Sequence, residues 1–152
     1  MSTLVLLTGL ALSACGDDKP DGPTVAQADK ALHAHIDELV GVGVGNVRNL
    51  KITDPGGKDI PCGEGKAKRT YAVSGDKRDP KRDDLSLTPV ELSNSMFGRL
   101  TTHVAKYELK QFSGGDPKKV MSNAETRTNL TFVVPAKGVI EIYGSTDCLR
   151  SG

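Results

Sequence analysis

The chain has 152 residues, a length typical of a single domain, and its 20 Lys and Arg are balanced by 19 Asp and Glu. This near-neutral balance does not provide the basic surface of a nucleic-acid-binding domain, so we expect no nucleic-acid partner. The hydrophobic fraction of 37% and the charged fraction of 26% exclude a long membrane span and a disordered chain. Because the chain has no Trp and only three Phe and three Tyr, its core must be built mainly from Val, Leu, Ile and Ala.

The first fifteen residues have the pattern of an export signal. Residues 3–12 form an uncharged apolar block, shorter than the about 20 residues that span a bilayer. The block ends in Leu12-Ser13-Ala14-Cys15, and the sequence GDDKPDGP that follows indicates a solvated linker. An apolar block that ends in small residues is typical of a secretory signal. The segment resembles the bacterial lipobox, in which a branched apolar residue and two small residues precede an obligatory Cys.

The lipobox resemblance implies lipidation of Cys15 and signal cleavage between Ala14 and Cys15. In that family the Cys thiol takes a diacylglyceryl group, a dedicated peptidase cuts before it, and the new amino terminus is often acylated. We therefore expect a signal peptide over 1–14, a lipidated Cys and tether over 15–23, and one domain over 24–152, anchored at the extracytoplasmic face of the cell membrane. The residues MST lack the positive charge typical of a signal, which leaves two alternatives open: a start upstream of Met1, or inefficient export. The alternative interpretation is an N-terminal core strand with a buried Cys.

Capping boxes and apolar stripes predict two helices. Thr24 and Gln27 have capping-box spacing and begin a helix expected over 25–40. Thr88 and Glu91 have the same spacing and begin the second helix. Apolar residues recur at three- and four-residue steps in both helices: Val25, Ala28, Leu32, Ile36 and Leu39 in the first, and Leu92, Met96, Leu100 and Val104 in the second.

Alternation and turn residues predict strands over 47–53, near 67–74, over 106–112, over 118–124, and in a hairpin around PAKG at 135–138. Residues 75–84 are expected to form a charged loop. In the hairpin, Leu130, Phe132 and Val134 should share one face. Strands joined by short turns pair antiparallel. The expected fold is therefore α+β and two-layered, with two helices on one face of an antiparallel sheet of four to six strands, and one disulfide.

Cys62 and Cys148 lie at the ends of predicted strands. An exported chain enters an oxidising space, where a bridge between them would persist and would stabilise the fold by roughly 4.5 kcal/mol on the chain-entropy model. Two free thiols, or one nucleophilic thiol, are the alternatives.

The sequence also resembles the small lipoproteins of actinobacterial type. The resemblance rests on Cys15 with its lipobox, on Pro-Cys-Gly at 61–63 before a strand, and on Gly-Ser-Thr-Asp-Cys at 144–148. In such proteins an early Pro-Cys and a late Cys that closes the last strand commonly mark a disulfide. The resemblance implies the same bridge between Cys62 and Cys148, and it implies no activity.

No motif of catalysis or metal binding is found in the sequence. His33 and His35 are two residues apart, so on a helix they point in nearly opposite directions and cannot share one ion. His103 is expected on the second helix, so it could share a metal ion with His33 or His35 only if the fold brought the two helices together there. G-x-S-x-G, H-E-x-x-H and C-x-x-C do not occur. We therefore expect no catalytic residue, metal or cofactor.

The expected function is a lipid-anchored, non-enzymatic module that binds a protein, glycan or lipid of the envelope or has a structural role there. A small extracytoplasmic hydrolase is the first alternative, and it requires a cleft in which acids or His103 converge with a strongly shifted pKa. An inhibitor of secreted hydrolases is the second, with the disulfide-pinned loop 54–66 as a rigid plug.

Overall fold

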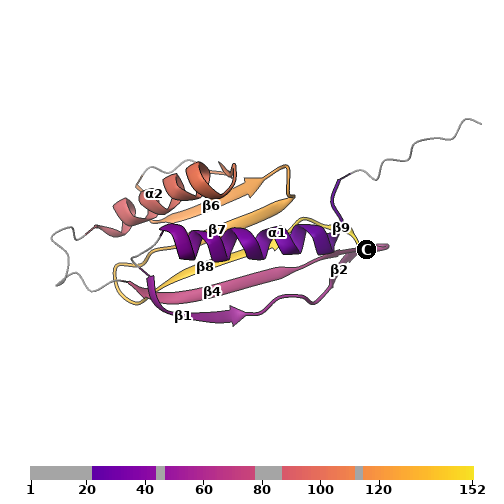
Figure 1. The fold of residues 1–152 in the computed structure, drawn as a ribbon, viewed down its shortest axis with the longest axis horizontal. Helices are drawn as coiled ribbons and strands as arrows, with labels where there is room; N and C mark the ends of the chain where they lie inside the picture. The colour runs from indigo at the N-terminus through magenta and orange to yellow at the C-terminus, as the bar shows by residue number, and fades with distance from the viewer. Residues whose placement is uncertain (1–21, 44–46, 78–86, 112–114) are drawn as a thin grey trace, which may run out of the picture.

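The computed structural model describes residues 22–43, 47–77, 87–111 and 115–152. They form an α+β fold in which two helices pack on an antiparallel six-stranded sheet, with a separate three-stranded sheet at one end (Figure 1). The fold class expected from the sequence is confirmed. In chain order the elements are α1 Val25–Glu38, η1 Leu39–Gly43, β1 Val47–Asp54, β2 Ile60–Gly63, β3 Lys66–Lys68, β4 Thr70–Lys77, α2 Pro89–Arg99, η3 Leu100–Val104, β5 Glu108–Leu109, β6 Lys118–Asn123, β7 Thr128–Val133, β8 Val139–Thr146 and β9 Leu149–Arg150.

Both helices begin at the predicted capping boxes. At α1 the Thr24 hydroxyl accepts from the N–H of Gln27, and the Gln27 side chain accepts from the N–H of Thr24. At α2, Thr88 and Glu91 form the same reciprocal pair. Each pair satisfies backbone donors that a helix start leaves free. Each helix continues into a π-helical turn, η1 after α1 and η3 after α2.

The large sheet has the strand order β1-β4-β8-β7-β6-β5, and every neighbouring pair is antiparallel. The hairpin expected around residues 135–138 is confirmed as β7 and β8. Leu130, Phe132 and Val134 are all buried, so the predicted shared face is also correct.

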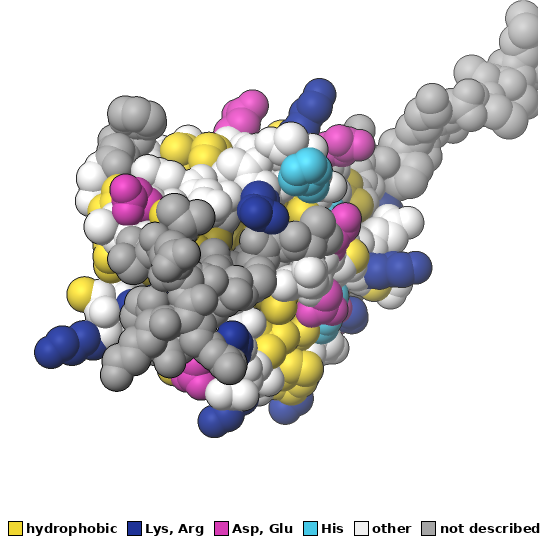
Figure 2. All heavy atoms as spheres, turned by 60° about the vertical axis from the view of Figure 1, so that its left-hand side comes forward, with side chains coloured by type: hydrophobic (Ala, Val, Ile, Leu, Met, Phe, Trp, Pro, Cys, Tyr) yellow, Lys and Arg dark blue, Asp and Glu magenta, His cyan; other side chains and the backbone are white. Residues whose placement is uncertain are grey.

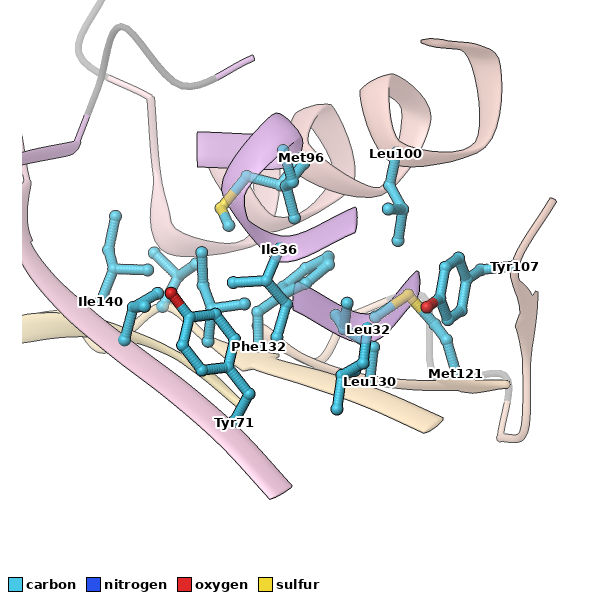
Figure 3. Close-up of a cluster of buried hydrophobic side chains, with 14 of the residues drawn as sticks. Leu32, Ile36, Tyr71, Met96, Leu100, Tyr107, Met121, Leu130, Phe132 and Ile140 are labelled. Carbon is cyan, nitrogen blue, oxygen red and sulfur yellow. The ribbon is translucent and has the colours of Figure 1, made fainter. Parts of the chain in front are cut away.

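The hydrophobic core lies between the helices and this sheet. Leu32 and Ile36 of α1, Met96 of α2, and Phe132 and Ile140 of the sheet are fully buried there (Figure 3). A second, smaller cluster joins the start of α1 to the small sheet through Val25, Ala28, Ala67 and Leu149.

Residues 60–77 differ from the prediction. One strand was expected near 67–74, whereas the structure has β2, β3 and β4 in this region. The chain changes sheets at Arg69, whose N–H donates to the Thr146 hydroxyl at 3.0 Å while its carbonyl accepts from the N–H of Thr146 at 2.9 Å. Pairing with β9 ends on one side of Arg69 and pairing with β8 begins on the other, so no single strand runs through it.

Two more segments differ at their ends. β4 continues to Lys77, which pairs with Val47 of β1, so the prediction of a loop was wrong for residues 75–77, and residues 78–84 lie outside the described part. The strand expected over 106–112 is reduced to β5. Glu108 and Leu109 pair with β6, and residue 112 lies outside the described part of the chain.

Cys62 and Cys148 are joined in a disulfide with their Cα atoms 5.9 Å apart. Cys62 belongs to β2, and Cys148 lies between β8 and β9. The bridge joins β2 to the segment just before β9 and so closes the small sheet β2-β3-β9, in which β9 pairs with β3.

Candidate functional site

The structure separates the histidines singled out in the sequence. His33 faces β4 and His35 faces the segment before β5, so they point away from each other, as predicted. His103 lies exposed in η3. Ala14 and Cys15 lie outside the described residues. Within the described part of the chain, no group of three or more His, Cys, Asp or Glu side chains is arranged to hold a metal ion.

A set of interacting polar side chains lies between α1 and β4, and we call Asp29, His33, Asp37, Arg69 and Tyr71 the α1–β4 polar cluster. The His33 ring stacks on the Tyr71 ring with centroids 3.7 Å apart. The Tyr71 hydroxyl donates to Oδ1 of Asp37 at 2.8 Å. Burial, and then this hydrogen bond, raise the pKa of Tyr71 to about 12. Tyr71 therefore stays protonated at neutral pH and acts as a donor.

Arg69 and His33 both approach the buried carboxylate of Asp29. An N–H of Arg69 lies 3.3 Å from Oδ2 of Asp29, and Nε of Arg69 donates to Asp59 at 2.6 Å. The other oxygen of Asp29 lies 3.6 Å from Nε2 of His33, too far for a hydrogen bond. Both atoms are buried and have no hydrogen-bond partner within the described structure.

The turn after β1 covers the outer side of this cluster. Asp54 accepts from the Thr70 hydroxyl at 2.6 Å and from the N–H of Gly56 at 3.0 Å, and these two bonds lower the pKa of Asp54 below its ordinary value. A Cβ on Gly56, whose φ is +70°, would lie 2.4 Å from the Thr70 carbonyl oxygen and 2.8 Å from Nε2 of His33. The turn thus approaches His33 as closely as only glycine permits.

Each acid of the cluster has a partner inside the protein, although Oδ1 of Asp29 makes no hydrogen bond within the described structure. Asp37 accepts from Tyr71, Asp29 pairs with Arg69, and the neighbouring Asp54 uses both of its oxygens. A catalytic nucleophile needs a base within hydrogen-bond reach. Nε2 of His33 could be such a base, but it has no hydrogen-bond partner among the described residues, so the cluster does not form a pair of nucleophile and base. Its contacts instead brace α1 against the sheet.

A second polar group lies on the opposite side of α1. Nδ1 of His35 is 3.0 Å from the Tyr107 hydroxyl, which is 2.8 Å from the hydroxyl of Thr128. Figure 3 shows Tyr71 and Tyr107 at opposite sides of the core. Burial lowers the pKa of His35, an effect that Glu38 only partly opposes, and burial raises the pKa of Tyr107 to about 12. This group is therefore neutral at neutral pH and ties α1 to β7.

His35 should make the stability of the protein depend on pH. The folded state lowers the pKa of His35 below the unfolded value of about 6.5, so the unfolded state binds more protons. His35 therefore contributes fully to the free energy of unfolding at pH values above the unfolded pKa. This contribution is lost as the pH falls from the unfolded pKa through the lower folded pKa. In His35→Gln, we expect the free energy of unfolding to fall less between neutral and mildly acidic pH than in the wild type, as measured by urea titrations at several pH values.

His103→Gln is the matched control, because His103 is exposed and its replacement removes a histidine while leaving the contacts of His35 in place. An identical profile for His35→Gln and the wild type would show that His35 protonates equally in the folded and unfolded states.

Sequence reasoning considered His33 only as a metal ligand and did not identify Asp29, Asp37 or Tyr71. One local signal was present, because Asp29, His33 and Asp37 recur every four residues and so share one helix face. No local signal marks Tyr71, because its contact with His33 requires β4 to lie beneath α1.

Comparison of the chain with protein-family models, with curated proteins and with solved structures finds no match.

Proposed function

We propose that the protein is a lipid-anchored, extracytoplasmic module with a non-enzymatic binding or structural role in a bacterial envelope. The observation that carries this proposal is the disulfide between Cys62 and Cys148. Disulfides persist in oxidising compartments outside the cytoplasm. Of the three cysteines of the chain, this bridge leaves Cys15, which is the residue that the lipobox pattern assigns to lipid.

A lipid on Cys15 fits the way in which the domain begins. No helix in the described part of the chain has the length and hydrophobicity needed to cross a bilayer. The linker over residues 16–23 would reach about 25 Å at ~3 Å per residue, and α1 begins soon after it at Val25. Two acyl chains, at about 0.8 kcal/mol for each buried methylene, would hold such a domain stably at the membrane surface.

Two observations favour a binding or structural role over a hydrolase. Asp29 and Asp37 of the α1–β4 polar cluster each have an internal partner, although Oδ1 of Asp29 makes no hydrogen bond within the described structure, and His103 lies exposed in η3. Large hydrophobic side chains are also exposed, and Ile52 on the edge strand β1 is 60% exposed. Figure 2 shows basic and acidic side chains interspersed over one face, with hydrophobic side chains gathered into a patch beside them. Exposed apolar groups rimmed by polar ones are typical of interaction surfaces.

Cys15→Ser tests the anchor. Labelled palmitate fed to a bacterial host should enter the wild-type protein. The substitution should abolish this labelling and leave the uncleaved precursor, because a hydroxyl does not replace the thiolate as nucleophile. Palmitate incorporation and the mass of the amino-terminal peptide measure both effects.

The double variant Cys62→Ser/Cys148→Ser is the control for a general effect of cysteine loss, and it should still be labelled. Label retained in Cys15→Ser, or absent from the wild type, would reject the anchor.

A further inference from the structure

The small sheet has one apolar face and one basic face. Ala67 of β3 and Leu149 of β9 are buried against α1. Side chains alternate between the two faces of a strand, so the neighbours of these residues point to the opposite side. Those neighbours are Lys66, Lys68 and Arg150, and all three are exposed. We call this side of the sheet the basic face.

The strand register brings the charges of the basic face together. Lys66 lies directly opposite Arg150, and Lys68 lies directly opposite Ile60, which is 39% exposed. Like charges at directly opposed positions destabilise a strand pair. Within the described structure, none of the three cations forms an ion pair that would offset this cost, and Glu64 is the single acidic residue between Ile60 and Lys68. The arrangement is therefore unfavourable for the isolated fold.

The basic face belongs to the end of the domain at which the chain leaves toward Cys15. Val25, the first residue of α1, packs with Ala67 and Leu149 of the small sheet, and a Cβ on Gly152 would lie 3.7 Å from the Thr24 hydroxyl. Figure 1 shows the start of α1 beside β9 and β2, with α2 toward the other end. An anchor on Cys15 would therefore hold this end, and not the opposite one, near the bilayer.

We propose that the basic face contacts the anionic phospholipid headgroups of the membrane that holds the anchor. This proposal rests on the lipid anchor proposed above, which would hold the domain close to the membrane. The three cations would attract the anionic headgroups, and the apolar side chain of Ile60 can enter the membrane interface. A lipid chain combined with a basic patch is an established way to strengthen membrane attachment. The contact would orient the domain with its small sheet toward the bilayer and the β7–β8 hairpin away from it.

The absence of tryptophan from the chain permits a direct test. In Ile60→Trp, the introduced indole is the sole tryptophan and lies on the basic face. The full chain is bound to vesicles of phosphatidylcholine, or of phosphatidylcholine with phosphatidylglycerol at about two to one, each with a fraction of brominated lipid. We expect a blue shift and quenching in the anionic vesicles only. Both effects should disappear near 1 M salt, where the Debye length is about 3 Å.

Charge reversal gives the matched comparison. Each cation near an anionic surface favours contact by roughly fivefold, so loss of three cations alone weakens the contact by about a hundredfold, and the added negative charges oppose it further. Lys66→Glu/Lys68→Glu/Arg150→Glu should therefore weaken the contact by at least about a hundredfold and reduce quenching to the level in neutral vesicles. Lys51→Glu/Lys118→Glu/Lys137→Glu changes the net charge equally on the large sheet and its hairpin, and it should leave quenching intact. Val139→Trp, placed at the start of β8 away from the small sheet, should show no quenching.

Other results would overturn the proposal. Quenching that is equal in neutral and anionic vesicles, or that survives reversal of the three cations, would show that the headgroups do not hold this face. Emission that is already blue-shifted without vesicles, and that moves to the red when Asp17, Asp18 and Asp21 are changed to Asn, would assign the face to the chain's own linker.

A separate measurement tests the anchor. Flotation of the protein with neutral vesicles, together with the mass of the peptide containing Cys15, shows whether Cys15 carries lipid. Flotation with both vesicle types but no anionic-specific quenching would reject the basic-face contact and keep the anchor. Salt-sensitive flotation with anionic vesicles alone would keep the contact and reject the anchor.

Discussion

Replacing Cys62 and Cys148 together by alanine is expected to lower the free energy of unfolding by about 4 kcal/mol, because the bridge joins residues 86 positions apart and so restricts a large part of the unfolded chain. The native contacts that would remain at this end are few. β9 has two residues and pairs with β3 at two positions, and the cluster around Leu149 holds four buried residues.

Urea unfolding followed by far-ultraviolet circular dichroism measures this loss, since the chain has no tryptophan for fluorescence. Wild-type protein treated with reductant should unfold at the same urea concentration as the double variant, and Cys15→Ser should unfold like the oxidised wild type. An unchanged midpoint in the double variant would show that the small sheet opens on its own before the rest of the domain. The bridge would then contribute only to local order.

The helices could be predicted because their signals are local. A capping box needs two side chains three residues apart, and an apolar stripe needs only the helical repeat, so both helix starts were correct at Thr24 and Thr88. The β7–β8 hairpin was predictable for the same reason, since its turn and its alternating residues are contiguous. These elements define the two layers of the fold, which explains why the fold class was correct.

The small sheet and the polar cluster could not be predicted because they depend on contacts between distant residues. The break at Arg69 is made by Thr146, which is 77 positions away, and no residue next to Arg69 signals it. β3 and β9 are too short for alternation to distinguish them from loops. The helical half of the cluster repeats every four residues, but its partner Tyr71 is 34 positions from Asp37. The fold brings these groups together, so the sequence pattern shows only one side of the site.

Gly144→Ala is expected to destabilise the protein by about 3 kcal/mol, since overpacking a core that has no free space typically costs 1–3 kcal/mol and a backbone obstacle adds to that. Gly144 lies in β8 beneath α1. A Cβ there would lie 2.5 Å from Cδ1 of Leu32 and 2.6 Å from the carbonyl oxygen of Asn129. The leucine side chain can move, whereas the carbonyl belongs to the paired strand β7 and cannot move without disturbing the ladder.

Gly98→Ala is the matched control, because Gly98 lies in α2 and a Cβ there would meet nothing within 4 Å. Alanine in a helix is favoured over glycine by roughly 0.5–1 kcal/mol, so this substitution should raise the free energy of unfolding. The two changes add the same methyl group, and opposite signs in parallel urea titrations would show that the space at Gly144 decides the result. The double variant Gly144→Ala/Leu32→Ala separates the two contacts. If the double variant is as stable as Leu32→Ala alone, the leucine side chain is the obstacle to the new methyl group. We expect the double variant to be less stable than Leu32→Ala, because the Asn129 carbonyl remains.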